Sequence, residues 1–158
     1  TCALPIFHTE YVDNFIALSQ DTALVGQLAA SVGDELNRRG LPTHPVEVCQ
    51  DTLGWHFSEN RPQVEMNPRR LWKLRFAILQ LIEDGWGSGR LVEKIVGHIT
   101  FAALLRREIL SCLQAVYVYI RKSYHVHSRL WPEVKRELRW VASLLPLIQR
   151  DLSAGWGD

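Results

Sequence analysis

The pattern of hydrophobic and polar positions changes near Asn67 and Pro68. Before this point, short runs of alternating or β-branched residues lie between turn residues. After it, apolar residues recur every three or four positions almost to the end of the chain. Alternation is typical of strands with one buried face, and the longer spacing is typical of helices with one buried face. The pattern therefore predicts an α+β fold in two parts, residues 1–66 and residues 67–158.

The first part is expected to open with a β-hairpin and a helix. Strands are predicted over 3–11 and 15–19. The turn between them, over 12–14, contains Asp and Asn, which tolerate the positive φ of tight turns. A helix over 23–39 follows, and Gly40 ends it. The apolar face of this helix is formed by Leu24, Leu28, Val32 and Leu36.

A second hairpin is expected next, with strands over 52–58 and 63–66 joined by a turn at 59–61. Asn67 before Pro68 favours a helix start, because the asparagine side chain can cap and proline has a preset φ. Helices are predicted over 68–84, 90–105, 108–124 and 132–144, with a flexible break at 86–89 and Pro146 ending the last. Their buried faces are expected to consist of Leu71, Leu74, Ile78, Leu91, Ile95, Ile99, Leu110, Leu113, Val134, Leu138 and Val141.

The net charge of +1 conceals an asymmetry between the two parts. Residues 1–66 contain three Lys and Arg against nine Asp and Glu, whereas residues 67–158 contain fifteen against eight. The first part is therefore acidic and the second basic. This contrast indicates either an anionic partner for the second part or attraction between the two parts.

Cysteine spacing and hydropathy exclude several classes of protein. Cys2, Cys49 and Cys112 are odd in number and far apart, which does not fit a zinc site or a disulfide framework. No apolar run approaches the roughly 20 residues that cross a bilayer, so we expect a soluble chain without a transmembrane segment. The first residues lack the features of a secretory signal, and no segment identifies a compartment.

One tetrapeptide in the first expected turn is a candidate for metal chemistry. Tyr11, Val12, Asp13 and Asn14 lie between two apolar strands. Polymerases that use two metal ions need carboxylates on rigid backbone, and a hairpin turn can hold one toward a shared Mg²⁺ site. By itself the tetrapeptide fits an ordinary Asp-Asn turn better.

Four further segments follow this hairpin in a characteristic order. They are LGWHFS at 53–58, VEKIVGHITFA at 92–102, LWP at 130–132 and ELRW at 137–140. With YVDN at 11–14, their order and spacing resemble the reverse transcriptases of retroviruses and retrotransposons. In that family a YxDD hairpin is followed by a palm helix, a primer-grip hairpin with an LG or MG dipeptide, and a helical thumb.

The resemblance implies a partial palm over 1–66 and a thumb over 67–158, taken from an RNA-directed DNA polymerase. Asp13 matches the first aspartate of the YxDD box, which ligates the catalytic Mg²⁺. Asn14 departs from the box and brings no negative charge. The family also requires an aspartate on an earlier palm strand, which nothing here matches. We therefore expect this chain alone to bind no Mg²⁺ and to be catalytically incompetent.

The resemblance also indicates residues that contact nucleic acid. Leu53, Gly54 and Trp55 match the primer-grip hairpin, although packing of that hairpin on its own core explains them equally well. In the thumb-like helix, basic side chains recur at i, i+4 and i+8, a spacing that can follow a phosphate backbone, beside a glycine that permits close approach. These positions are Arg90, Lys94, His98 and Gly97. A solvated helix face is the alternative interpretation.

Two functional hypotheses follow from this sequence. The first is a fragment or remnant of a reverse transcriptase that retains binding of primer-template nucleic acid. The second is a reverse-transcriptase remnant reused as a structural or adaptor subunit, with protein subunits of a larger assembly as its partners. Strongly salt-dependent binding of nucleic acid distinguishes the first from the second.

Overall fold

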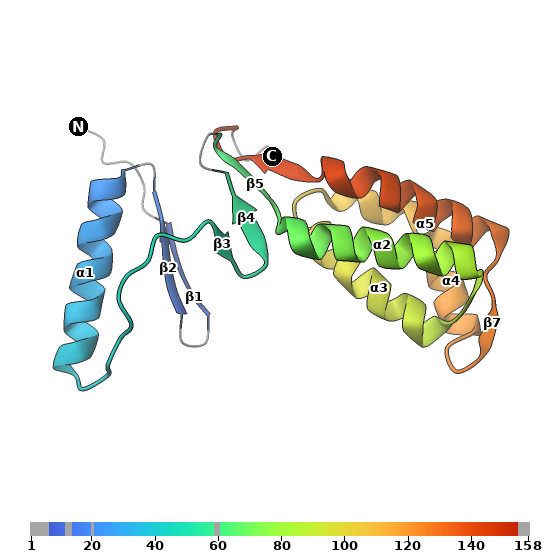
Figure 1. Cartoon of the computed structure of the whole chain (residues 1–158), viewed down its shortest axis with the longest axis horizontal. Coiled ribbons are helices and arrows are strands. Elements are labelled where there is room, and N and C mark those ends of the chain that lie inside the picture. The colour runs from blue at the N-terminus through green and yellow to red at the C-terminus, as the bar shows by residue number, and fades with distance from the viewer. Residues whose placement is uncertain (1–6, 12–13, 20, 59–60, 155–158) are drawn as a thin grey trace. The chain divides into compact units, whose positions relative to one another are not determined.

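The computed structural model describes residues 7–11, 14–19, 21–58 and 61–154 (Figure 1). The chain divides into two compact units, Thr1–Val48 and Cys49–Asp158. This boundary lies earlier than the one expected after residue 66. The reason is that the second group of strands pairs with a strand from the end of the chain, and so belongs with the helices.

The first unit contains an antiparallel hairpin and one helix, as the sequence predicts. Strands β1 (Phe7–Tyr11) and β2 (Asn14–Leu18) pair in register from Phe7 opposite Leu18 to Tyr11 opposite Asn14. Helix α1 (Thr22–Arg38) begins after Asp21, whose carboxylate accepts a hydrogen bond from the amide of Leu24 at 3.0 Å. Gly40 follows the helix with φ of 78°. This left-handed conformation favours glycine, which explains the end of the helix.

The second unit begins with a small antiparallel sheet. Its strands, in spatial order, are β3 (Asp51–Thr52), β4 (Trp55–Phe57), β5 (Gln63–Met66) and β8 (Gln149–Asp151). The hairpin formed by β4 and β5 agrees with the prediction, and its tip at 59–60 lies outside the described residues. Strand β8 was not expected, because its pairing with β5 spans most of the unit and leaves no local signal.

The prediction of a single strand over 52–58 was wrong. Leu53 and Gly54 form a two-residue turn with φ of 51° and 88°, and this turn divides the segment into β3 and β4. Two consecutive positive φ values are typical of the tight turns that join antiparallel strands. Gly54 supplies the flexibility for this turn, and its carbonyl accepts a hydrogen bond from the amide of Asn67 at 2.9 Å.

Four α-helices, two short 3₁₀ helices and a two-stranded ribbon make up the rest of the described part of the second unit. The α-helices are α2 (Pro68–Asp84), α3 (Gly89–Ala102), α4 (Gln114–Lys122) and α5 (Pro132–Leu144). Figure 1 shows α3 and α5 lying on either side of α2, with contacts between both pairs. The predicted bounds of α2 and α5 are confirmed. Within the described residues, no helix combines the length and hydropathy needed to span a bilayer.

The helical core is formed by the faces of these helices that point toward one another. Its most completely buried residues are Ile78, Val92, Ile99, Leu113, Val116, Tyr119, Val134, Leu138, Val141 and Leu145. Two expected core residues are not fully buried: Leu91 is 44% exposed, and Leu110 is half-buried against the core. Residues at i, i+4 and i+8 drift around a helix of 3.6 residues per turn, so Leu91 falls at the edge of the buried face of α3.

The segment expected as a flexible break is a strand. β6 (Trp86–Ser88) pairs with β7 (His127–Arg129) in an antiparallel ribbon. The buried Tyr119 hydroxyl fastens this ribbon, because it donates to the Gly87 carbonyl at 2.7 Å and lies 3.0 Å from the Ser128 hydroxyl. Pairing with β7, which is distant in sequence, therefore orders a segment whose local sequence predicts a flexible break.

The helix predicted over 108–124 is interrupted. A 3₁₀ helix covers Arg107–Cys112, and α4 starts only after Leu113, where φ is −106° and ψ is 28°. The first amides of α4 have a partner from α5: the Glu137 carboxylate accepts hydrogen bonds from Ala115 and Val116, both at 3.0 Å. This cap explains why a charged side chain is buried in the core, with 8% exposure.

Candidate nucleic-acid interface

The catalytic part of the predicted site falls largely outside the described residues. Asp13 lies outside the described residues, and Asn14 is the first residue of β2. In the part of the chain that the structure describes, no three His, Cys, Asp or Glu side chains are grouped to hold a metal ion. The Mg²⁺ role of Asp13 therefore stays a prediction.

The segment over 53–55 packs against the start of α2 and the end of α3. The ring of Trp55 stacks on Phe101 of α3, with centroids 4.4 Å apart and planes 19° apart. The Arg70 guanidinium of α2 lies 4.7 Å from the centre of the same Phe101 ring. A side chain at Gly54 would overlap this guanidinium. Trp55 is thus a packing residue, while Leu53 at the turn remains 40% exposed.

A cavity of about 320 Å³ opens beside this cluster, between α2 and α3. Its floor is apolar and includes Met66, Leu74 and Ile95, which are buried in the helical core. Its remaining lining comes from Ala77 and three basic side chains, Arg70, Lys73 and His98. No acidic residue lines the cavity, so the described lining offers positive charge only.

Basic residues continue along the exposed side of α3. Arg90, Lys94 and His98 are all exposed, as their spacing predicts. Glu93 is the single acidic residue among 89–102, and its carboxylate accepts a hydrogen bond from the Tyr124 hydroxyl at 2.8 Å. This hydrogen bond raises the pKa of Tyr124, since the neutral phenol is the donor.

Gly97 lies on the same surface, and a Cβ built there would meet no atom within 4 Å. A ligand can therefore approach the backbone of α3 closely at this point. The five basic side chains of this surface make no ion pair with a carboxylate in the described part of the chain. They are Arg70, Lys73, Arg90, Lys94 and His98. We call this set the α2–α3 basic surface.

The sequence identified three of the five basic residues of this surface. Arg90, Lys94 and His98 were found because they repeat at helical spacing on one helix. Arg70 and Lys73 were missed, although they too are three residues apart and follow a clear helix start. The signal was present, but only the packing of α2 on α3 places Arg70 and Lys73 beside His98 in one groove.

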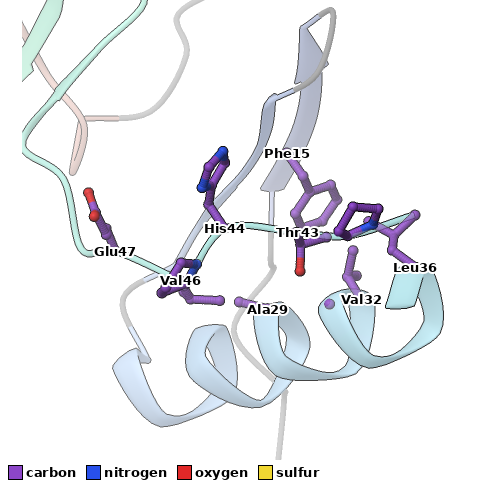
Figure 2. Close-up of a pocket in the computed structure, with 11 residues that line it drawn as sticks. Phe15, Ala29, Val32, Leu36, Thr43, His44, Val46 and Glu47 are labelled. Atoms are coloured by element: carbon purple, nitrogen blue, oxygen red, sulfur yellow. The ribbon is translucent and has the colours of Figure 1, made fainter. Parts of the chain in front are cut away.

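The first unit has a separate cleft of about 650 Å³ between α1 and the segment over 42–47 (Figure 2). Figure 2 shows the ring of Phe15 beside Val32 and Leu36 of α1, with His44 and Glu47 on the opposite segment. The apolar positions of α1 are half-buried here, and none is fully buried. The lining offers no cluster of catalytic groups among its described residues.

Comparison of the chain with protein-family models, with curated proteins and with solved structures finds no match. What the described geometry defines is a class of surface: a groove between two packed helices with a basic lining, continued by exposed basic residues along α3.

Proposed function

We propose that this chain is a fragment or remnant of an RNA-directed DNA polymerase, and that its second unit binds the sugar-phosphate backbone of a primer-template duplex. The α2–α3 basic surface carries this proposal. Its five basic side chains form no ion pair with a carboxylate among the described residues. Arg70, Lys73 and His98 line the groove, and Arg90 and Lys94 continue the basic surface along α3. The backbone of a nucleic acid is a polymer of phosphate groups, and a row of cations binds such a polymeric anion.

The chemistry of the groove supports backbone binding over reading of bases. Among the residues that line the groove, Lys73 presents a point charge and His98 a single donor, and the rigid fork of Arg70 is already stacked on Phe101. The aromatic ring of Trp55 is engaged by Phe101 and is not offered to a base. Binding is therefore expected to depend weakly on sequence and strongly on salt.

The proposal predicts how binding of a fluorescently labelled primer-template duplex responds to salt. Four side chains of the surface carry a permanent charge. A plot of the logarithm of the binding constant against the logarithm of salt concentration should therefore have a slope of about −3 to −4. The double substitution of Arg90 and Lys94 by alanine should reduce the magnitude of this slope by about two. Fluorescence anisotropy across a salt series measures both slopes.

A matched control is available on α5. Arg136 and Arg139 are exposed cations of the same unit, and their replacement with alanine removes the same charge from another helix. This double variant should bind nearly as the original chain does. Equal losses in the two double variants would mean that net charge alone governs binding, and would remove the assignment to α3.

A second prediction concerns catalysis. The 158-residue chain with Mg²⁺ and all four deoxynucleotides should not extend a primer, because Asn14 brings no charge to offset divalent cations beside Asp13. Gel analysis of a labelled primer is the measurement. Extension that disappears in Asp13→Ala would show that this chain is an active polymerase.

A second candidate function is that of a structural or adaptor subunit, and one observation favours it. Trp72, Phe76 and Leu79 on α2 are 55%, 68% and 37% exposed and share one side of the helix. Exposed apolar surface of this kind marks sites of protein association. An adaptor should bind the duplex poorly and copurify with protein partners at fixed stoichiometry.

A further inference from the structure

One exposed side of α2 has the residue spacing of a surface that packs against a second helix, and we call this side the seam. The positions involved are Arg69, Trp72, Phe76, Leu79 and Glu83, all of them exposed. They are separated by three, four, three and four residues, which is the spacing of positions that meet between two packed helices. The core-facing residues of α2 fall on another side, since they include Leu71, Leu74 and Ile78.

The seam is apolar in the middle and charged at its two ends, with opposite signs. Arg69 lies in the first turn of α2 and Glu83 in the last, about 21 Å apart for a rise of 1.5 Å per residue. Neither side chain forms an ion pair within the described residues. Phe76 lies midway between them in sequence, seven residues from each end.

This charge order specifies one orientation of a matching helix. If a second copy of α2 packs antiparallel across a two-fold axis at Phe76, Arg69 of each copy lies opposite Glu83 of the other. The two Phe76 rings then meet at the centre. A parallel pair would instead place Arg69 against Arg69 and Glu83 against Glu83, which is unfavourable. The self-complementary pattern is what a two-fold interface requires.

Trp72, the other aromatic residue of the seam, is already held in position. The guanidinium of Arg75 lies 5.3 Å from the centre of the Trp72 ring, and its Nε donates to the Ala142 carbonyl of α5 at 3.1 Å. Less side-chain entropy is therefore lost when Trp72 is covered. Lys73 and Gln80 border the seam, and Gln80 is engaged with Asp84 at 2.9 Å.

We propose that the chain forms a two-fold symmetric dimer through antiparallel pairing of α2 with α2 of a second copy. One helix pair buries less area than a standard protein interface, so the dimer is reversible and depends on concentration. The inference is independent of nucleic-acid binding, because it uses a different side of α2 from the one that lines the groove.

Sedimentation velocity of the full chain over a wide concentration range tests the proposal. The original chain should shift from monomer to dimer as concentration rises, and Phe76→Glu should remain monomeric, because two carboxylates would meet at the axis. Circular dichroism of this variant should be unchanged, since Phe76 is 68% exposed. A chain that stays monomeric throughout, or a dimer that Phe76→Glu leaves intact, would refute the proposal.

Charge exchange at the ends of the seam tests the orientation. Arg69→Glu and Glu83→Arg should each weaken self-association at least tenfold, yet an equimolar mixture of the two variants should dimerise, because both end contacts are then attractive. The double variant should dimerise by itself. Both substitutions suit the helix dipole, so loss of the dimer would not arise from loss of α2. Arg136→Glu on α5 is the matched control.

The pairing is wrong if the mixture stays as monomeric as the separate variants. It is equally wrong if Arg136→Glu weakens the dimer as much as Arg69→Glu does, because the effect would then follow net charge and not position. Arg69 and Glu83 are too far apart within one helix to contact each other, so recovery in the mixture can come only from contact between two copies.

Discussion

Replacement of Glu137 with alanine is expected to lower the free energy of unfolding of the second unit by about 3 kcal/mol. The Glu137 carboxylate accepts from the amides of Ala115 and Val116, which begin α4. The residue that precedes α4, Leu113, has an apolar side chain and makes no capping hydrogen bond to the helix. Removal of the carboxylate leaves the buried Val116 amide and the partly buried Ala115 amide without this partner. It also takes a negative charge from the positive end of the helix dipole.

The tryptophans of this chain make the measurement selective. All six lie between Trp55 and Trp156, so none belongs to the first unit. Urea unfolding followed by tryptophan fluorescence therefore reports on the second unit, where a loss of about 3 kcal/mol should lower the midpoint by about 1 to 2 M. Glu137→Gln keeps one acceptor and should give an intermediate loss.

Glu133→Ala is the control, because it removes the same charge from the exposed first turn of α5. Its cost should stay below about 1 kcal/mol, the size of an exposed charge at a helix end. If Glu137→Ala unfolds at the same midpoint as Glu133→Ala, the carboxylate does not support α4 as described.

Substitution of Gly89 with alanine should produce the second large effect, a loss of about 2 to 3 kcal/mol. Gly89 is buried at the start of α3, and its amide donates to the Ser123 carbonyl at 2.7 Å. A methyl group there would overlap the Ile120 carbonyl oxygen and lie 2.8 Å from Tyr124 Cα. These are backbone atoms, so α3 and the end of α4 would have to separate.

Gly97→Ala in the same helix is the matched comparison. No atom lies within 4 Å of the added methyl group, and alanine favours the helix over glycine, so this variant should gain about 0.5 to 1 kcal/mol. The same fluorescence experiment measures both variants. Equal changes in stability would contradict the described packing of α3 on α4.

Local sequence signals predicted the elements whose ends are fixed by their own residues. Helix α2 starts at Pro68 because the Asn67 side chain accepts from the Arg69 amide at 3.0 Å, and it ends at Gly85 with φ of 72°. The hairpin of the first unit was predicted from the alternation of its strands around a turn-forming pair. Such contacts span a few residues, so they can be read from the chain in order.

Elements that depend on distant partners were misread. The strand at 86–88 looks like a flexible linker because two of its neighbours are glycines, yet it is ordered by pairing with 127–129. The turn at Leu53 requires a positive φ that local propensity disfavours, and Arg70 and Phe101 pack against the adjacent Gly54. In these cases tertiary contacts override local preference.

The sequence by itself determined which residues are basic, which faces of the helices are apolar, and where most helices begin, because those properties follow from residue type and spacing along one element. The resemblance of the order of segments to a reverse transcriptase also comes from the sequence and stays a prediction. Only the tertiary structure joined Arg70 and Lys73 to His98 in one groove and gave α4 its cap from Glu137. Both arrangements need α2, α3 and α5 to pack together, and residues that meet across helices leave no spacing pattern in the chain.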